Sequence, residues 1–501
     1  MSPKLHELQA LIPSAEVHGD RDTEVVDLTL DSRNVQKGWM FCCTKGSRFD
    51  GHDFADQAVA LGASALVVAR PLPLPIPQLI LPSVRNGLGR ISAFLNDYPS
   101  SKLDLIGITG TNGKTTTSYL LESILRTTKR STGIIGTIEA RYNTSRQPSL
   151  YTTPEAPELH RHLRQMYEDH IDSVVMEVSS HGIDQHRIDA TTFALSIFTN
   201  LTPEHLDYHG TIEQYYSVKA QLFTPDRTAL ALICVDDAWG RRLASQIRVP
   251  SFTFGQHPSA DLRISSVSVT TTGTSLTVSG LGLDTRLETS VVGACNAENA
   301  AAAYLAGRLL GATIEEARSG IATCEAISGR FQRIETSEDL LVVVDYAHTP
   351  DSIRALVNTA RDIIGPHQRV ILVAGARGKR DRFKRPELGR AAATADLAVL
   401  TTDNPGDEDP QSIVDQLIAG TIDIPKKNFI VELDRAVAIR RAILAADPGD
   451  AVLIVGRGHE NSLRVGSTTI NLDDREEALR SIQLRDHKNT SSLEQLMIGK
   501  L

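Results

Sequence analysis

Apolar residues along this chain follow repeating patterns that divide it into parts. The first part, residues 1–95, mixes strand-like runs with helical patches; the runs are 24–32, 40–44 and 65–69, and the patches are 52–63 and 87–98. After it, buried apolar runs alternate with helical segments, as in LIGITG followed by TTTSYLLESILRTT. This alternation predicts a mostly parallel sheet that is covered by helices.

The later part of the chain contains one exception and then a second set of alternating elements. Between residues 260 and 292, Thr and Val alternate in VSVTTTGTSLTVSG, which predicts antiparallel strands on one side. Strand–helix alternation then returns, with strands at 340–348, 369–378, 397–405 and 451–460. Each of these strands ends in glycines or polar residues, where an open α/β sheet binds its ligands.

We therefore expect an α/β protein with three domains. The N-terminal domain is mixed α/β over residues 1–95, and the central domain spans 96–328 with a parallel sheet and a small antiparallel sheet. A C-terminal Rossmann-like domain fills 329–501, with a polar tail from about residue 487. The length of 501 residues agrees with this division, because domains average ~150 residues.

Composition narrows the class of protein. The formal net charge of −9 argues against a nucleic-acid-binding or anionic-membrane surface. The five cysteines form no C-x-x-C pair, which indicates free thiols in a reducing compartment. The N-terminus lacks a signal-peptide pattern, and no run of 18 apolar residues is present. We expect a cytoplasmic protein without membrane insertion.

The stretch GITGTNGKTTTSYLLE has the order of a phosphate-binding loop: strand, glycine-rich turn, lysine and helix. Gly110 and Gly113 allow backbone N–H groups to turn inward, Lys114 reaches the β/γ oxygens of a triphosphate, and Thr115 can ligate Mg²⁺. Ile108 occupies the place of the first glycine in the standard motif. The alternative is a glycine-rich turn that merely opens a helix.

Candidate catalytic residues follow this loop. Glu177 ends the apolar strand of VVMEVSSHG, where a carboxylate can hold Mg²⁺. The adjacent Ser-Ser-His run does not make a serine triad, because sequence neighbours do not form one and no matched Asp is evident. His205 lies in NLTPEHLDYHG, which alone is more typical of a structural loop. Lys219, in YYSVKAQLF, sits among apolar and aromatic neighbours on a predicted helix.

Eight motifs in order, from GTNGKTT to GRGHE, make the chain similar to the Mur ligases, specifically the UDP-N-acetylmuramoyl-tripeptide synthetases. The others are MEVSSHG, NLTPEHLDYHG, YYSVKAQLF, DYAHTPDS, GKRDRFKRPELG and DNP. The resemblance covers nearly the whole chain. It implies a UDP-MurNAc-binding domain, an ATP-binding domain and an amino-acid-binding domain, in that order.

The resemblance also implies a reaction in peptidoglycan precursor synthesis, and therefore a role in cell shape and division. The D-glutamyl carboxylate of UDP-MurNAc-L-Ala-D-Glu attacks the γ-phosphate of ATP, and the amine of a diamino acid then captures the acyl phosphate. Magnesium is implied near Thr115, and a second ion on Glu177, His205 and Lys219. Because a charged lysine cannot bind Mg²⁺, the resemblance implies that CO₂ converts Lys219 to a carbamate, N6-carboxylysine.

Further residues are implied by position in the family motifs. On the nucleotide they are Gly110, Thr111, Asn112, Gly113, Lys114, Thr115, Thr116, Asn296, Arg330, Asp345 and His348. On the UDP-MurNAc-dipeptide they are Leu30, Ser32, Ser47, Thr152, Thr153, Ser179, Gln185 and Arg187. On the incoming amino acid they are Arg380, Asp403, Asn404, Pro405, Gly406, Gly456 and Glu460.

The identity of the amino acid depends on TTDNPGDEDP. Relatives that add meso-diaminopimelate have arginine where this chain has Gly406, and three acidic residues follow it. This favours L-lysine or L-ornithine, with meso-diaminopimelate as the alternative because Arg377 and Lys379 are extra cations on a neighbouring loop. A folylpolyglutamate-synthase-like ligase and a P-loop NTPase that moves a partner are more distant alternatives. We expect a monomer.

Overall fold

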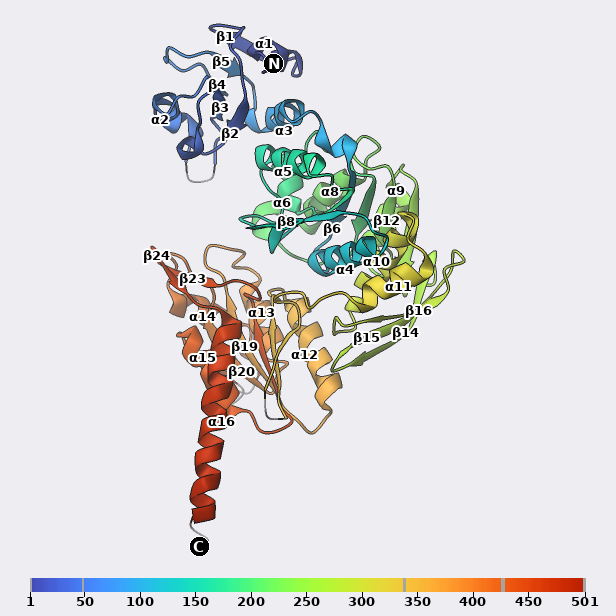
Figure 1. Ribbon diagram of the computed structural model, residues 1–501. Coiled ribbons are helices and arrows are strands. Elements are labelled where there is room, and N and C mark those ends of the chain that lie inside the picture. Colours follow the sequence, from blue (N-terminus) through green and yellow to red (C-terminus); the bar gives the residue numbers. More distant parts are fainter. Residues whose placement is uncertain (1, 47–48, 337–338, 425–428, 499–501) are drawn as a thin grey trace.

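The computed structural model describes residues 2–46, 49–336, 339–424 and 429–498, and it has three domains in chain order (Figure 1). The N-terminal domain is a five-stranded sheet in the order β1-β5-β4-β3-β2. Its strands are β1 (Glu16–His18), β2 (Asp27–Thr29), β3 (Trp39–Cys42), β4 (Ala65–Val68) and β5 (Gln78–Ile80). The helices are α1 (Leu5–Ala10), α2 (Ala55–Ala60) and α3 (Val84–Leu95).

The central domain is built on one eleven-stranded sheet in the order β16-β15-β14-β13-β12-β11-β6-β10-β7-β8-β9. Its parallel part consists of β6 (Asp104–Thr109), β7 (Thr132–Ile135), β10 (Ser173–Glu177), β11 (Leu195–Phe198), β12 (Ala231–Cys234) and β13 (Ser251–Gly255). Its helices are α4 (Lys114–Thr127), α5 (Ala156–Glu168), α6 (Ser180–Asp184), α7 (Leu206–His209), α8 (Ile212–Ala220), α9 (Ala238–Gln246), α10 (Asn296–Leu309) and α11 (Ile314–Ala322).

Antiparallel strands extend this sheet at both ends. On one side lie β14 (Leu262–Thr270), β15 (Gly273–Ser279) and β16 (Thr285–Thr289), where the Thr/Val alternation predicted them. On the other side lie β8 (Glu139–Tyr142) and β9 (Ser145–Pro148), which the sequence pattern did not reveal. Their burial is low because they form an edge hairpin, so an apolar period is missing.

The C-terminal domain is a six-stranded sheet in the order β17-β18-β22-β19-β20-β21. These strands are β17 (Gln332–Ile334), β18 (Leu341–Asp345), β19 (Val370–Ala376), β20 (Leu397–Thr402), β21 (Phe429–Val431) and β22 (Ala451–Val455). Around them lie α12 (Pro350–Ile364), α13 (Arg385–Ala392), α14 (Pro410–Ala419), α15 (Arg435–Ala445), α16 (Asp474–Ile498) and the hairpin β23 (Ser462–Val465) and β24 (Thr468–Asn471). The far part of α16 projects away from this domain (Figure 1).

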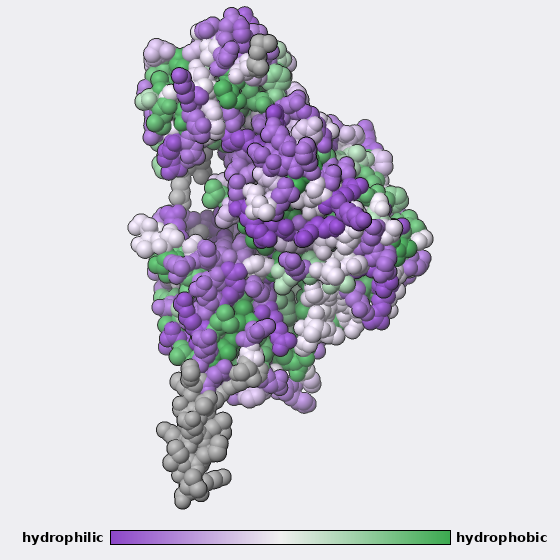
Figure 2. Space-filling model, viewed as in Figure 1, coloured by the Kyte–Doolittle hydropathy of each residue, from purple (hydrophilic) through white to green (hydrophobic). Residues whose placement is uncertain are grey.

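Each of the three large sheets has a buried core on both faces, which is what the continuous apolar runs of parallel strands require. Figure 2 shows hydrophilic residues over much of the visible surface and a hollow between the N- and C-terminal domains, beside the central domain. Among the described residues, none of the helices combines the length and apolarity needed to cross a membrane. The carboxyl ends of β6, β10 and β11 carry the residues considered next.

Candidate functional site

The glycine-rich loop between β6 and α4 depends on two glycines. Gly110 has φ +150°, and a Cβ added there would lie 1.9 Å from the Thr199 hydroxyl oxygen. Gly113 has φ +87°, and its added Cβ would lie 2.3 Å from Oδ1 of Asn299. Lys114 opens the helix and its Nζ donates to the carbonyl oxygens of Gly110 and Thr111, both at 2.9 Å. The loop therefore curls around the lysine, as phosphate binding requires.

Lys219 reaches the same loop from α8. Its Nζ donates to the Gly110 carbonyl oxygen at 2.9 Å, and it lies 4.7 Å from the centre of the Tyr215 ring. The side chain is fully buried. Burial, reinforced by the nearby Lys114 ammonium, lowers the pKa of Lys219 well below its usual value. The environment thus favours the neutral amine, which is the form that can react with an electrophile such as CO₂.

Glu177 lies at the carboxyl end of β10, directly beside β6 in the sheet. Its carboxylate accepts hydrogen bonds from the Thr115 hydroxyl at 3.0 Å, the Thr137 backbone N–H at 2.9 Å and the Thr137 hydroxyl at 2.9 Å. The side chain is completely buried. The structure therefore brings the loop hydroxyl and the strand-end carboxylate together; Thr137, which completes the group, follows β7 and carries no sequence motif.

His205 begins α7 with a left-handed backbone, φ 57°. Its ring meets the His181 ring edge-on, with centroids 4.7 Å apart. Burial lowers the pKa of His205 strongly, and His181, Lys384 and Lys219 add to the effect. Burial likewise lowers the pKa of His181 to about 4. Both imidazoles are therefore neutral at physiological pH, and a neutral imidazole has a nitrogen lone pair for a metal.

Three contacts connect the C-terminal domain and its linker to this centre. Nη2 of Arg330 donates to the Thr115 hydroxyl oxygen at 2.9 Å. Lys384 donates to Oε1 of Glu204 at 2.8 Å, and Nε2 of His348 lies 3.9 Å from the same oxygen. Glu204 and Lys384 were not predicted as site residues. Their pairing cannot be read from sequence, because 180 positions and a domain boundary separate them.

Two more residues predicted on the nucleotide side lie at the ends of elements, Asn296 at the start of α10 and Asp345 at the end of β18. Asn296 accepts from Nδ2 of Asn299 at 2.8 Å, and Asn299 in turn faces Gly113. The Asp345 carboxylate accepts from the backbone N–H groups of Phe331 and Ala347 at 2.6 Å each. Burial raises the pKa of Asp345.

Residues predicted to contact the muramoyl dipeptide cluster beside Glu177. The Thr153 hydroxyl donates to the Glu177 carbonyl oxygen at 3.0 Å, and its oxygen lies 3.1 Å from the Ser179 hydroxyl oxygen. Arg187 donates to the Thr153 carbonyl oxygen at 2.9 Å and to Gln185 at 2.7 Å. Thr152 lies on the same wall, with its hydroxyl 3.0 Å from that of Thr137, and Tyr151 stacks 4.4 Å under the Arg187 guanidinium.

The N-terminal domain holds the predicted uridine-side residues. Leu30 is half-buried just after β2, and the Ser32 hydroxyl donates to Gln57 at 2.8 Å. Ser47 lies outside the described residues.

The predicted acceptor residues gather where β20 and β22 end. Asn404 donates to Oε2 of Glu460 at 2.9 Å and to Asp403 at 3.3 Å. Gly456 has φ +107°, and its added Cβ would lie 2.7 Å from Asp403. Pro405 packs under the loop of Gly378, whose added Cβ would lie 1.8 Å from the Pro405 carbonyl oxygen. Gly406 has φ +57°, with open space where its Cβ would be.

Arg457, in the GRGHE motif, has a structural role that the motif did not reveal. It is fully buried and contacts Oδ1 of Asp474 at 3.0 Å. Arg435 contacts the same carboxylate at 2.9 and 2.7 Å, and it is also buried. One carboxylate therefore balances two buried guanidinium groups and fixes the start of α16 to the loop that carries Glu460.

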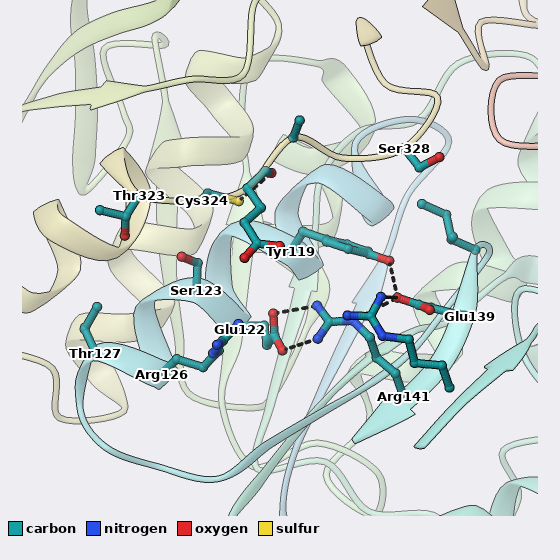
Figure 3. Close-up of a pocket in the computed structure, with 14 residues that line it drawn as sticks. Tyr119, Glu122, Ser123, Arg126, Thr127, Glu139, Arg141, Thr323, Cys324 and Ser328 are labelled. Atoms are coloured by element: carbon teal, nitrogen blue, oxygen red, sulfur yellow. Dashed lines mark hydrogen bonds and ion pairs between the residues drawn. The ribbon is translucent and has the colours of Figure 1, made fainter. Parts of the chain in front are cut away.

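A cavity of about 490 Å³ lies on the outer side of α4, away from these residues (Figure 3). Figure 3 shows Arg141 forming a two-pronged ion pair with Glu122, at 2.9 and 2.8 Å, while the Tyr119 hydroxyl donates to Glu139. None of the residues predicted for the site lines it. The charges along its wall are mostly paired with each other.

Comparison with known families matches all three domains. The profile described as "Mur ligase middle domain" matches residues 108–307, "Mur ligase, glutamate ligase domain" matches 329–458, and "Mur ligase family, catalytic domain" matches 24–84. These matches agree with the family resemblance found in the sequence motifs.

Two curated relatives match nearly end to end, and both are named UDP-N-acetylmuramoyl-L-alanyl-D-glutamate–2,6-diaminopimelate ligase. The protein of Geobacillus thermodenitrificans is 37% identical over 493 residues, covering 96% of this chain and 100% of the relative. The protein of Gloeobacter violaceus is 40% identical over 492 residues, covering 96% and 98%. The names favour the diaminopimelate alternative over our expectation of lysine or ornithine.

Solved structures show the same architecture. A structure of a UDP-N-acetylmuramoyl-L-alanyl-D-glutamate–2,6-diaminopimelate ligase superposes with a TM-score of 0.66 at 28% identity, covering 97% of this chain and 100% of that one. The MurF ligase of Thermotoga maritima in complex with ADP superposes with a TM-score of 0.66 at 20% identity, covering 92% and 98%. The second likeness shows the fold alone.

Proposed function

This chain belongs to the Mur ligase family, and from that premise we propose that it adds 2,6-diaminopimelate to UDP-MurNAc-L-Ala-D-Glu at the expense of ATP. One observation carries the proposal for the chemistry. The Thr115 hydroxyl meets both the strand-end carboxylate Glu177 and the guanidinium of Arg330. A nucleotide at the loop is thereby in reach of the carboxylate that can hold its metal ion and of a cation contributed by the next domain.

The proposed reaction has two steps. A carboxylate oxygen of the D-glutamyl residue attacks the γ-phosphorus of ATP, so an O–P bond forms, the bond to the β–γ bridging oxygen breaks, and ADP leaves. The amine of the acceptor then attacks the acyl carbon, the C–O bond to phosphate breaks, and the amine loses a proton as the amide forms. Both partners of the first step are anions, so Lys114 and Arg330 would offset their repulsion.

The residues present fit magnesium. Thr115 offers a hydroxyl oxygen and Glu177 a carboxylate, both oxygen donors of the kind that Mg²⁺ prefers, and His205 offers a neutral imidazole. We propose that Thr115 holds one ion and that Glu177, His205 and Lys219 hold a second. When bound, the ions would neutralise charge on the transferring phosphoryl group.

Lys219 would join this set only after modification. Its environment favours the neutral amine, whose nitrogen can attack CO₂ to form an N–C bond and release a proton, leaving a carbamate. That product places an anion beside the Lys114 ammonium, with which it would pair. The fully buried Lys219 shares the Gly110 carbonyl oxygen with the half-buried Lys114, and this arrangement supports the proposal.

The identity of the acceptor has a second candidate. The names of the relatives support 2,6-diaminopimelate, whereas Gly406 and the acidic residues after it favour L-lysine or L-ornithine. We also propose that the protein acts as a monomer in the cytoplasm, where ATP and UDP-sugar substrates are made.

A ligation assay tests the proposed function. Purified protein would be incubated with ATP, Mg²⁺, UDP-MurNAc-L-Ala-D-Glu and either meso-diaminopimelate, L-lysine, L-ornithine or a monoamine, and the products read by mass spectrometry. The expected product is the UDP-muramoyl tripeptide with diaminopimelate, formed in proportion to ADP. Release of ADP without any lengthened peptide would refute the ligase mechanism. A strong preference for lysine or ornithine would refute the proposed acceptor alone.

A further inference from the structure

A diaminopimelate acceptor carries a carboxylate at each end, and lysine carries only one. The distal end of diaminopimelate is itself an amino-acid head group, with an ammonium and a carboxylate on one carbon. A site for this head group needs a hydrogen-bond acceptor for the ammonium and a cation for the carboxylate. Among cationic side chains, the guanidinium of arginine suits a carboxylate best. The acceptor pocket contains several cations, and most of them are already paired.

The paired cations lie on the loop before α13 and at the first residue of that helix. Arg377 contacts the Glu460 carboxylate and lies 3.9 Å from Asp403. Lys379 donates to Asp407 at 2.8 Å. Arg385 is buried and forms a two-pronged pair with Glu408, at 2.8 and 2.9 Å. Each of these pairs would have to break before the cation could bind a substrate carboxylate.

Arg380 serves the opposite end of the pocket. The family motif assigns it to the incoming amino acid, and its charge acts on His181, whose pKa is lowered first by burial and then by neighbouring cations. The α-carboxylate, which sits next to the reacting amine, is the substrate group that belongs at that end.

Arg464 differs from these arginines and lysines because its guanidinium has no close carboxylate partner among the described residues. It lies on β23, in the hairpin that faces the N-terminal domain at the edge of the C-terminal domain (Figure 1). Its side chain is 52% exposed, and its one recorded carboxylate contact among the described residues is a long one, 3.9 Å to Asp407. Nε donates to the Gly466 carbonyl oxygen at 3.2 Å, which leaves the outer guanidinium nitrogens directed by only weak contacts.

The backbone of Arg464 is fixed to the acceptor turn. Its N–H donates to Oδ1 of Asn404 at 2.9 Å, and its carbonyl oxygen accepts from the Gly406 N–H at 3.2 Å. Asn404 uses its other end to donate to Glu460 at 2.9 Å. A single asparagine therefore joins a carboxylate, Glu460, to the residue that carries an available guanidinium. The two groups match the ammonium and the carboxylate of the distal head group.

We propose that Arg464 is a specificity-determining residue that binds the distal carboxylate of the diamino diacid, while Glu460 receives its ammonium. The proposal rests on the proposed function. It also accounts for a diaminopimelate-type pocket with glycine at position 406, because the cation comes from the strand that lies across that glycine. The distal group does not react, so Arg464 contributes binding that is equal in ground state and transition state.

The test compares Arg464→Gln with wild type in the ligation assay, using meso-diaminopimelate and L-lysine as acceptors. Arg464 bonds Asn404 and Gly406 through its own backbone N–H and carbonyl groups. The substitution therefore removes the guanidinium and leaves these two hydrogen bonds in place. We expect KM for meso-diaminopimelate to rise about 10- to 100-fold with kcat little changed, and KM for lysine to stay within about 2-fold. Arg441→Gln is the matched control. Arg441 lies on α15, its side chain is 56% exposed, and it pairs with Glu432 at 3.2 Å.

A second variant tests whether the guanidinium itself is what matters. Gly406 bonds the backbone of Arg464 and has open space at its Cβ, although its φ of +57° strains any other residue there. Gly406→Arg in the Arg464→Gln background should therefore recover part, but not all, of the affinity for meso-diaminopimelate. Equal losses with both acceptors, or no loss with meso-diaminopimelate, would overturn the proposal. Failure of the wild-type protein to ligate either acceptor would instead refute the proposed function, so the two failures are distinguishable.

Discussion

Replacing Lys219 gives the sharpest prediction, because stability and activity should change independently. Lys114 and Lys219 each donate to the Gly110 carbonyl oxygen at 2.9 Å, so their Nζ atoms lie at most about 5.8 Å apart. If both lysines were protonated, their charges would repel by at least about 3 kcal/mol at an effective dielectric constant of ~20, which favours the neutral amine at Lys219. Lys219→Met removes this buried amine and keeps the stem. The unfolding free energy of the nucleotide-free protein should therefore stay the same or increase.

Activity should fall in the same variant. If carbamylated Lys219 holds magnesium, Lys219→Met loses a ligand oxygen, and kcat should decrease at least ~100-fold. In Lys219→Ala, which leaves space, added acetate or propionate should restore part of kcat by supplying a carboxylate. The measurements are ADP-coupled ligation rates and urea unfolding. Ligase activity within about 3-fold of wild type in Lys219→Met would refute the carbamate, and a loss of more than ~2 kcal/mol in stability would show that Lys219 is structural.

Two further predictions concern stability. Asp474→Asn leaves the buried Arg435 and Arg457 without a counter-charge. It should destabilise the C-terminal domain by about 3–5 kcal/mol, measured by urea unfolding. A loss below ~1 kcal/mol would contradict the role assigned to this carboxylate. Burial lowers the pKa of His160 to about 4, so the unfolded chain, with a value near 6.5, binds the proton more tightly. His160 alone should therefore lower stability by about 2 kcal/mol between pH 7 and pH 5, and His160→Leu should remove that part of the slope while His18→Leu, at an exposed position, keeps it.

Much of the fold could be predicted because parallel strands buried on both faces read as continuous apolar runs. The loop from Gly110 to Thr115 and the strand-end position of Glu177 were also readable, since glycine spacing and a carboxylate after an apolar strand are local signals. The comparisons confirm the family and the three-domain architecture.

Other features required the structure because their signals are not local. The β8–β9 hairpin has no apolar period, and Thr137, which bonds Glu177, follows β7 without a motif. Arg457 stands between the predicted acceptor residues Gly456 and Glu460, yet it is fully buried against Asp474, a contact that no sequence signal announces. The meaning of Gly406 depends on Arg464, 58 positions later, which only the pairing of β23 with the acceptor turn brings to it.

In the proposed reaction, the contacts between domains would keep the acyl phosphate from water. Lys384, which opens α13, pairs with Glu204 beside His205, and Arg330 reaches the Thr115 hydroxyl from the linker. Both cations come from the part of the chain that also carries the acceptor pocket. A negatively charged phosphoryl group at the loop attracts those cations, so nucleotide binding would hold the acceptor domain against the reaction centre. The amine would then lie next to the activated carbon when it forms, and water that would hydrolyse the intermediate would be displaced.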